Sequence, residues 1–301
     1  MSNDVLIATL ADTARKAART LVAASFEERK AALLAIATAL ESSVEEIVAA
    51  NNQDMERGKT AGLNSQLLDR LMLNETRIKA IAGGTRKVAA LPNPLGNVLR
   101  KRTLDNGLEL TQVTVPFGVV GMVYEARPNV TVDAAVILIM SGNATLLRGS
   151  SSAEKSNEVL VSVMRRALST TRISPEVLQL IPSHDRDTTR ALLHARGKVD
   201  LVIPRGSAAL IRMVVDESTV PTIETGAGVC HVYVDEKADL SKALPILINS
   251  KTHRPSVCNA AETLLVHKKV KDEFLPKALR ELHSAGVKLH GDEPTFAIAK
   301  E

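Results

Sequence analysis

The part of the sequence that most restricts the fold is a regular alternation of short apolar runs and longer amphipathic segments, which begins at Pro116. The apolar runs are typical of buried strands and lie at residues 118–125, 144–149, 176–181 and 199–206. Each is followed by a segment with helical spacing of its apolar residues, at 129–142, 151–171, 186–197 and 207–218. A helix between two strands lets the chain return and run parallel to the first strand. We therefore predict an α/β fold with a doubly wound parallel sheet.

Three loops of this predicted sheet are the expected ligand site. In doubly wound sheets, ligands bind beyond the carboxyl ends of the strands, and those ends carry residues 124–129, 147–152 and 203–207. The nearest match to the common dinucleotide fingerprint, residues 226–231, has a histidine at the third glycine position and continues into a strand-like run. We therefore expect a cofactor at the three loops without that fingerprint.

The residues before Pro116 are predicted to form helices and then a hairpin. Helical spacing continues through the first ninety or so residues and ends at the two prolines of 91–96. Two strand-like runs flank Asn106-Gly107, a strong short hairpin signal, so a hairpin is expected at 98–113. Capping boxes, in which a serine and a glutamate satisfy free helix amides, are expected at Ser25–Glu28 and Ser151–Glu154.

Composition limits the partners and the compartment. Apolar residues make up 45% of the 301 residues but aromatic residues only 2%, so the core is expected to be aliphatic. The net charge of +4 is spread along the chain, and rings for base stacking are scarce, which disfavours nucleic-acid binding. The longest apolar stretch, residues 130–140, is too short to cross a bilayer and contains Asp133. The two cysteines form no disulfide framework and no metal-ligand spacing, so we expect a reduced, cytoplasmic protein without a metal.

The C-terminal residues have an unfinished pattern. Residues 287–291 are typical of another strand, and residues 292–301 of a helix that has barely begun. A complete sheet domain rarely ends at such a point, so a missing C-terminal part is expected.

One of the two cysteines, Cys230, lies in a strand-like run. With the two-residue period of a strand, it shares a face with Val232 and Val234, while His231 points to the other face. A free cysteine on an aliphatic face is usually a small buried hydrophobe, which is the favoured interpretation for Cys230.

The other cysteine, Cys258, lies in a loop or short turn that follows Pro255. Lys251, His253 and Arg254 precede it closely. Nearby cations raise the fraction of reactive thiolate, but a charged loop is also often only solvated. From these residues alone, a nucleophile and a bystander are equally supported.

Five motifs in order resemble those of one family: YEARPNVTVDAA, GNATLLRG, DLVIPRGS, ETGAGVCHVYVD and KTHRPSVCNAAETLLV. The chain is similar to the γ-glutamyl phosphate reductases (glutamate-5-semialdehyde dehydrogenases) of the aldehyde dehydrogenase superfamily, from its N-terminal helices to its last residue. The resemblance implies N-terminal helices and a Rossmann-like NADP-binding domain at 1–225. It further implies an α/β catalytic domain, incomplete at its C-terminus, at 226–301, and an oligomerisation element in the hairpin.

The resemblance also implies a reaction: NADPH reduces L-glutamyl 5-phosphate to L-glutamate 5-semialdehyde and phosphate, the second step of proline biosynthesis. Cys258 matches the catalytic cysteine and Asn129 the asparagine that stabilises the oxyanion, with a helix N-cap as the plainer role for Asn129. Glu224 matches the superfamily's deacylating glutamate by order. Because an acyl-phosphate reductase must keep water from its thioester, proton transfer and loop shaping stay open for Glu224.

Cofactor and substrate positions follow from the same resemblance. A 2′-phosphate of NADP(H) is expected at Arg148, Ser150 and Ser151, which otherwise form a polar turn that caps the next helix. The cofactor pyrophosphate and nicotinamide are expected near Arg205, Gly206 and Ser207. The anionic substrate is expected at Arg127, Lys251 and Arg254, each of which could instead be a surface charge.

The implied partners are small molecules, further copies of the chain in a homo-oligomer, and glutamate 5-kinase as a candidate. Two alternatives remain from the sequence. One is another aldehyde dehydrogenase-superfamily oxidoreductase with a different acyl or aldehyde substrate, and the other is an inactive nucleotide-binding fragment.

Overall fold

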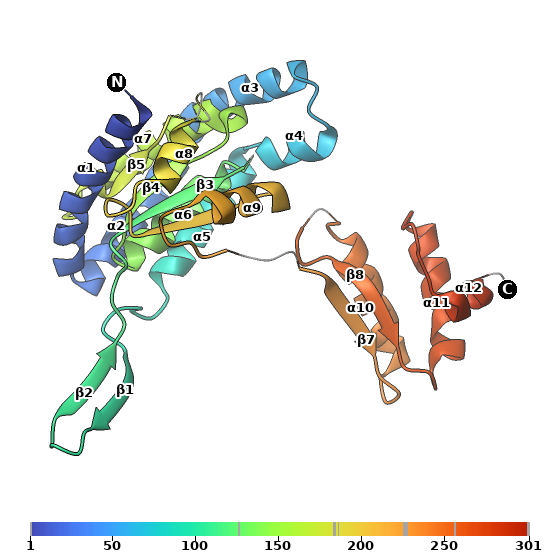
Figure 1. Ribbon diagram of the computed structural model, residues 1–301. Coiled ribbons are helices and arrows are strands. Elements are labelled where there is room, and N and C mark those ends of the chain that lie inside the picture. The colour runs from blue at the N-terminus through green and yellow to red at the C-terminus, as the bar shows by residue number, and fades with distance from the viewer. Residues whose placement is uncertain are drawn as a thin grey trace. The chain divides into compact units, whose positions relative to one another are not determined.

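The computed structural model describes residues 2–125, 127–182, 185, 187–224, 228–255 and 257–299. The chain forms two compact units, Met1–Thr225 and Gly226–Glu301 (Figure 1). Within the described ranges, no helix is both long and apolar enough to cross a membrane.

The first unit is organised around a parallel sheet of four strands. They are β3 (Val119–Tyr124), β4 (Ala144–Arg148), β5 (Leu178–Leu180) and β6 (Leu201–Arg205), in the order β5-β4-β3-β6. All four strands come from the predicted apolar runs, so the predicted parallel α/β sheet is confirmed. In its register, Arg148 lies beside Val123 and Arg205 beside Tyr124, so the loops after β3, β4 and β6 leave the same edge.

Helices cover both faces of this sheet. On one face, α6 (Asn129–Met140) and α7 (Glu154–Ser169) pack against the strands, with α2 (Phe26–Ser42) and α5 (Glu75–Ala89) behind them. On the other face, α1 (Asn3–Ala23) packs against β3, β4, β5 and α8 (Asp187–Leu193). The remaining helices of the unit are α3 (Val44–Thr60), α4 (Ser65–Leu71) and α9 (Ala208–Glu217), with short 3₁₀ turns η1 (Ser151–Ala153) and η2 (Pro175–Val177).

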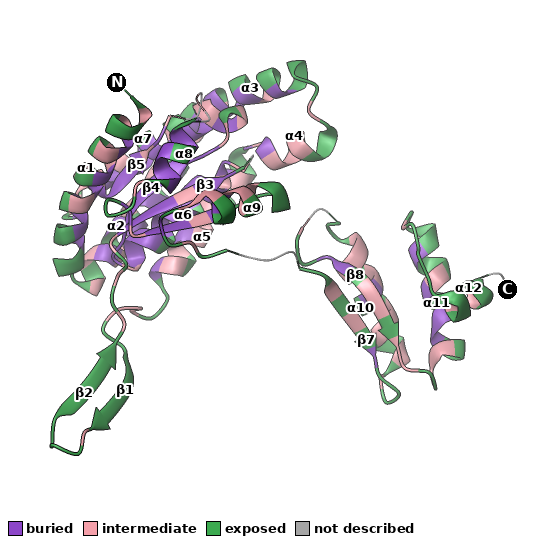
Figure 2. Cartoon of the chain, in the orientation of Figure 1, coloured by how far each residue is buried: buried purple, intermediate pink, exposed green. Residues whose placement is uncertain are grey.

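The core of this unit is aliphatic, as the composition predicts. Figure 2 shows the strands of the four-stranded sheet and the inward faces of the helices as largely buried, and the fully buried large side chains are leucines and isoleucines. Burying such a side chain contributes about 1.5–3 kcal/mol, so this layer favours folding of the unit strongly. The predicted capping box of Ser25 and Glu28 forms at the start of α2.

The predicted hairpin also forms, as β1 (Val98–Thr103) and β2 (Glu109–Val113). Gly107 has a φ of +82°, a left-handed conformation that glycine adopts without a steric penalty. Every residue of both strands is exposed, including Leu99 at 64% (Figure 2). The hairpin therefore presents apolar side chains that the rest of the chain does not cover.

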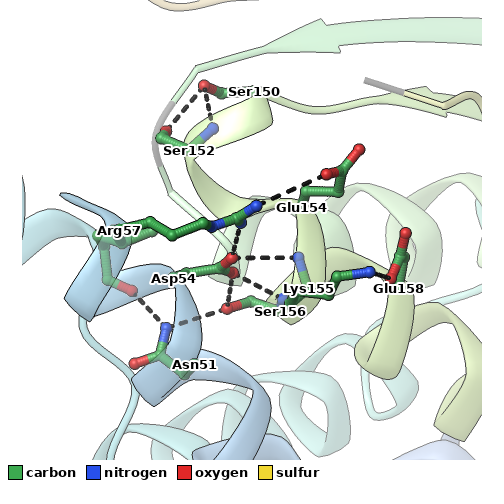
Figure 3. Close-up of polar contacts among 10 residues, drawn as sticks. Asn51, Asp54, Arg57, Ser150, Ser152, Glu154, Lys155, Ser156 and Glu158 are labelled. Carbon is green, nitrogen blue, oxygen red and sulfur yellow. Dashed lines mark hydrogen bonds and ion pairs between the residues drawn. The ribbon is translucent and has the colours of Figure 1, made fainter. Parts of the chain in front are cut away.

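The predicted capping box of Ser151 and Glu154 is wrong. The α7 helix has no side-chain cap from its own flanking residue; instead Asp54 of α3 accepts from the amide nitrogens of Lys155 and Ser156, at 3.2 and 2.7 Å (Figure 3). The Ser156 hydroxyl also donates to Asp54, at 2.6 Å. A carboxylate from a distant helix therefore satisfies two free amides in the first turn of α7, whereas the predicted box would have used the amides of Ser151 and Glu154.

Asp54 is fully buried, and its bonds join α3 to the start of α7. Arg57 pairs with it, and the Asn51 amide donates to the Ser156 hydroxyl at 3.0 Å (Figure 3). This cluster sets the position of the helix that follows the loop after β4.

Replacing Asp54 with alanine should therefore destabilise the first unit by about 2–4 kcal/mol, because buried donors of Ser156 lose their acceptor. Urea denaturation followed by circular dichroism measures the loss, and amide hydrogen exchange at Lys155 and Ser156 locates it. Glu56→Ala on the same helix removes an exposed carboxylate paired with Lys59, and should change stability by less than about 0.5 kcal/mol. Equal losses in the two variants would contradict the role given to Asp54.

The second unit has its own small sheet and core. Strands β7 (Cys230–Val234) and β8 (Ala261–Val266) pair in parallel, with α10 (Leu240–Thr252), α11 (Lys271–Ser284) and α12 (Glu293–Ala299). The buried side chains of its hydrophobic cluster are Val234, Leu247, Phe274, Ala278 and Leu282. The helix predicted from residue 292 onward appears as α12, but the strand predicted at 287–291 is wrong, because no described strand pairs with that segment.

Candidate active site

Cys258 lies on a short turn between α10 and β8, as the sequence predicts. After α10 ends, the amide of Val257 donates to the carbonyl of Arg254, and the amide of Ala260 to the carbonyl of Val257, both at 3.2 Å. Cys258 is exposed on this turn, and it is a free thiol. A nucleophile must reach its substrate, and this position meets that requirement.

Cys230 supports the same turn from the neighbouring strand. The burial of β7 alternates as expected, with His231 and Tyr233 exposed and Val234 buried. Cys230 itself is only half-buried, and its thiol lies 3.4 Å from the carbonyl oxygen of Cys258, to which it donates. The sequence pattern predicts a buried hydrophobe at Cys230 and gives no sign of this contact, because the pairing of two distant segments creates it.

Asn129 is the first residue of α6, directly after the loop that follows β3. The alternative role of helix N-cap is wrong: Pro128 holds the N-cap position, and no side chain caps the helix. Instead the Asn129 amide nitrogen donates to a carboxylate oxygen of Asp133 at 2.9 Å. Desolvation by neighbouring residues raises the pKa of the Asp133 carboxyl, and this hydrogen bond partly opposes the increase.

A buried hydrogen-bond chain holds the first turn of α6 in place. The Tyr124 hydroxyl and the Thr131 hydroxyl lie 2.7 Å apart, and Thr131 donates to the side-chain oxygen of Asn157 at 2.7 Å. Burial raises the pKa of the Tyr124 phenol, so the group remains neutral. The chain connects the end of β3, α6 and α7, and it fixes the turn from which Asn129 projects.

Arg148 ends β4 and is largely buried. Its guanidinium donates to the backbone carbonyls of Gly149, at 2.8 Å, and Asp185, at 3.1 Å. Ser150 accepts from the amide of Ser152 at 3.2 Å, so it caps η1 as the polar-turn alternative describes, while Ser151 is exposed. Of the three predicted 2′-phosphate ligands, Ser151 is thus the most accessible in this arrangement.

Ser207 caps α9 and already binds a carboxylate. Its amide donates to Glu125 at 2.6 Å, and its hydroxyl donates to the other oxygen of the same carboxylate at 3.2 Å. A Cβ at Gly206 would lie 2.5 Å from the Glu125 side chain, so only glycine allows this approach without displacement. The start of α9 therefore accepts an oxyanion, and the Glu125 carboxylate lies where a phosphate oxygen would bind; the sequence alone shows no sign of this role for Glu125.

The remaining predicted residues divide between the two units. Lys251, in the last turn of α10, and the exposed Arg254 share the second unit with Cys258. Arg127 is half-buried in the first unit, and Glu224 is exposed there, two residues after a bridge between Thr222 and Val202 of β6. Among the described residues, no group of three or more His, Cys, Asp or Glu side chains could hold a metal ion.

Comparison with known proteins places this arrangement in a family. The model of the aldehyde dehydrogenase family matches residues 2–297. The chain is 54% identical over 284 residues to the γ-glutamyl phosphate reductase of Thermobifida fusca, with 94% of this chain and 68% of that protein covered. The chain belongs to the γ-glutamyl phosphate reductases, within the aldehyde dehydrogenase family. The resemblance read from the five motifs is confirmed.

Other members of this reductase family agree. The γ-glutamyl phosphate reductase of Kineococcus radiotolerans is 55% identical, with 95% of this chain and 66% of that protein covered. The crystal structure of the γ-glutamyl phosphate reductase of Thermotoga maritima superposes with a TM-score of 0.90 at 42% identity, covering 98% of this chain and 71% of that one. The chain thus spans about two thirds of the length of these relatives, and the predicted aldehyde dehydrogenase-like fold is confirmed.

Membership of this reductase family identifies the protein as an oxidoreductase that acts on a small molecule and uses a nicotinamide cofactor. A nicotinamide cofactor fits at the edge of the first unit's parallel sheet where the carboxyl ends of the strands lie. The Ser207 amide and hydroxyl already bind the carboxylate of Glu125 there. Because the Glu125 side chain is exposed, it can move away and leave these two donors to a phosphate.

Proposed function

We propose that the protein reduces L-glutamyl 5-phosphate to L-glutamate 5-semialdehyde and phosphate with NADPH, in the proline-biosynthesis route. The main support for this proposal is the sequence identity of 54% and 55% to two γ-glutamyl phosphate reductases, over 94% and 95% of the chain. The exposed Cys258 thiol on its turn supports it, since the reaction needs an accessible nucleophile.

In the proposed mechanism, the Cys258 thiolate attacks the acyl carbon of the substrate. The carbon–sulfur bond forms as the carbon–oxygen bond to phosphate breaks, and phosphate leaves with the electron pair. The Asn129 amide and the Cys258 backbone N–H stabilise the negative oxygen of each tetrahedral intermediate. When bound, the cofactor supplies the hydride that reduces the thioester, after which the carbon–sulfur bond breaks and the thiolate is regenerated.

For the cofactor, we propose that Ser207 and Gly206 receive the pyrophosphate in place of the Glu125 carboxylate, with Arg205 beside them. The hydroxyls of Ser151 and Ser150 bind the 2′-phosphate and Arg148 supports their loop, which makes NADP(H) the preferred form. The buried guanidinium of Arg148 is bound to carbonyl oxygens, so we expect it to position the loop after β4 while the serine hydroxyls bind the phosphate.

For the substrate, we propose that Lys251, Arg254 and Arg127 bind the carboxylate and phosphate groups, because cations recognise planar and tetrahedral oxyanions. Glu224 takes part in proton transfer or shapes its loop. The exposed hairpin is proposed as the oligomerisation element, with glutamate 5-kinase as a further partner and the cytoplasm as the compartment.

The test runs the reaction in the oxidative direction. The protein is incubated with L-glutamate 5-semialdehyde, phosphate and NADP, and absorbance of the reduced nicotinamide is followed. We expect phosphate-dependent reduction of NADP, with kcat/KM about tenfold or more above that for NAD, as contacts to a charged phosphate would give. Turnover only with other aldehydes would favour a different substrate, and NADP binding without any turnover would favour an inactive fragment.

A further inference from the structure

The α6 helix has a single uncovered stripe. Nine of its residues are buried, by the sheet, α2, α5 and α7. The other three are Asn129, which is half-buried, and Asp133 and Ile137, which are exposed. These positions are four residues apart, so they lie above one another on one helix face. Packing explains the apolar residues of this helix, but it does not explain the exposed carboxylate of Asp133.

Asp133 contacts the residue proposed to bind the reacting oxygen. The Asn129 amide nitrogen has two hydrogens and donates one of them to Asp133, at 2.9 Å. Because a carboxylate only accepts, this bond orients the nitrogen of the amide toward Asp133, and the second hydrogen is left to donate elsewhere. One oxygen of Asp133 is engaged in this bond, and the side chain remains open to solvent.

The substrate of the proposed reaction has a group for which no recognition residue has been given. L-glutamyl 5-phosphate carries an α-ammonium group beside its α-carboxylate, whereas Arg127, Lys251 and Arg254 are all cations and would repel it. We propose that Asp133 binds this α-ammonium group and thereby selects an amino-acid substrate. This inference rests on the proposed function and adds a specificity residue to it.

The length of the substrate agrees with the positions of Asn129 and Asp133. In an extended glutamyl chain, the ammonium nitrogen lies about 5 Å from the acyl carbon, given carbon–carbon bonds of about 1.5 Å. The Asn129 amide nitrogen and one Asp133 oxygen lie 2.9 Å apart, so hydrogen bonds of about 3 Å from the acyl oxygen to Asn129 and from the ammonium group to Asp133 span this length. A substrate whose acyl oxygen is bound by Asn129 can therefore run along α6 and place its ammonium group at Asp133. Asp133 accepts a hydrogen bond from the Asn129 amide, so its ion pair with the ammonium group would fix both ends of the substrate relative to each other.

The test separates ammonium binding from simple support of Asn129. Asp133→Asn keeps the shape and removes the charge. The wild type and this variant are assayed with NADP and phosphate on two aldehydes, L-glutamate 5-semialdehyde and 5-oxopentanoate, which has the same carbon chain and carboxylate but no amino group. Asp216→Asn, the same substitution at an exposed position near the end of α9, is the matched control.

We expect Asp133→Asn to lower kcat/KM for the amino aldehyde by about 10- to 100-fold, as loss of a charged hydrogen bond would, and to leave 5-oxopentanoate within about twofold. Asp216→Asn should change neither value. Equal losses on both aldehydes would overturn the inference and leave Asp133 as a support for Asn129. Wild-type protein that turns over neither aldehyde would overturn the proposed function, and this inference with it.

Discussion

Cys258→Ser should lower kcat for phosphate-dependent NADP reduction by at least about 10³-fold, with little change in the folding of the protein. The serine hydroxyl has nearly the same size as the thiol, but it is not ionised near neutral pH and is a much weaker nucleophile. Because the side chain at 258 is exposed, the exchange leaves no cavity. Stopped-flow absorbance of the nicotinamide, with NADP binding measured in parallel, separates loss of chemistry from loss of binding.

Cys230→Ser is the matched control for this experiment. It makes the same exchange 28 residues earlier, and a hydroxyl there can still donate to the Cys258 carbonyl. We expect it to keep activity within about tenfold of the wild type, since it leaves the proposed nucleophile in place. If Cys230→Ser instead abolished turnover while Cys258→Ser retained it, the assignment of the nucleophile would be wrong.

Asn129→Ala should lower kcat by about 10²–10³-fold, the usual cost of losing one oxyanion donor, with a much smaller change in KM for the aldehyde. The substitution also removes the hydrogen bond to Asp133, but it leaves the first turn of α6 held through Thr131. Alanine has a high helix propensity, so the helix itself should remain. The rate of hydride transfer in a single turnover measures the effect directly.

The rate at which iodoacetamide alkylates Cys258 serves as the control for Asn129→Ala. That rate reports the thiolate alone and should be unchanged, because the oxyanion forms only after attack on the substrate. A fall in kcat accompanied by an equal fall in alkylation would assign Asn129 to activation of the thiol. An unchanged kcat would remove Asn129 from the mechanism.

Much of the sheet could be predicted because its signals are local. Each strand of the four-stranded sheet is a short apolar run between turn residues, and its burial follows from covering both faces with helices. The hairpin follows from Asn106-Gly107 in the same way. The capping box predicted at Ser151 does not form, because α7 begins only at Glu154 and its first free amides bind Asp54, about 100 residues earlier in the chain. The prediction of a strand at 287–291 is wrong because a strand needs a neighbouring strand to pair with, and a local sequence pattern does not show whether one is present.

The candidate site shows the same difference between local features and contacts that join distant residues. The sequence by itself determined the α/β class, the turn that exposes Cys258 and the five motifs that place the chain in its family, because these depend on residues close together in the chain. Only the tertiary structure decided which groups meet: Glu125 with Ser207, Cys230 with the Cys258 carbonyl, and Arg148 with the carbonyl of Asp185. It also left Asp133 uncovered beside Asn129, because burial of a helix face is decided by what packs against it and not by the helix's own residues.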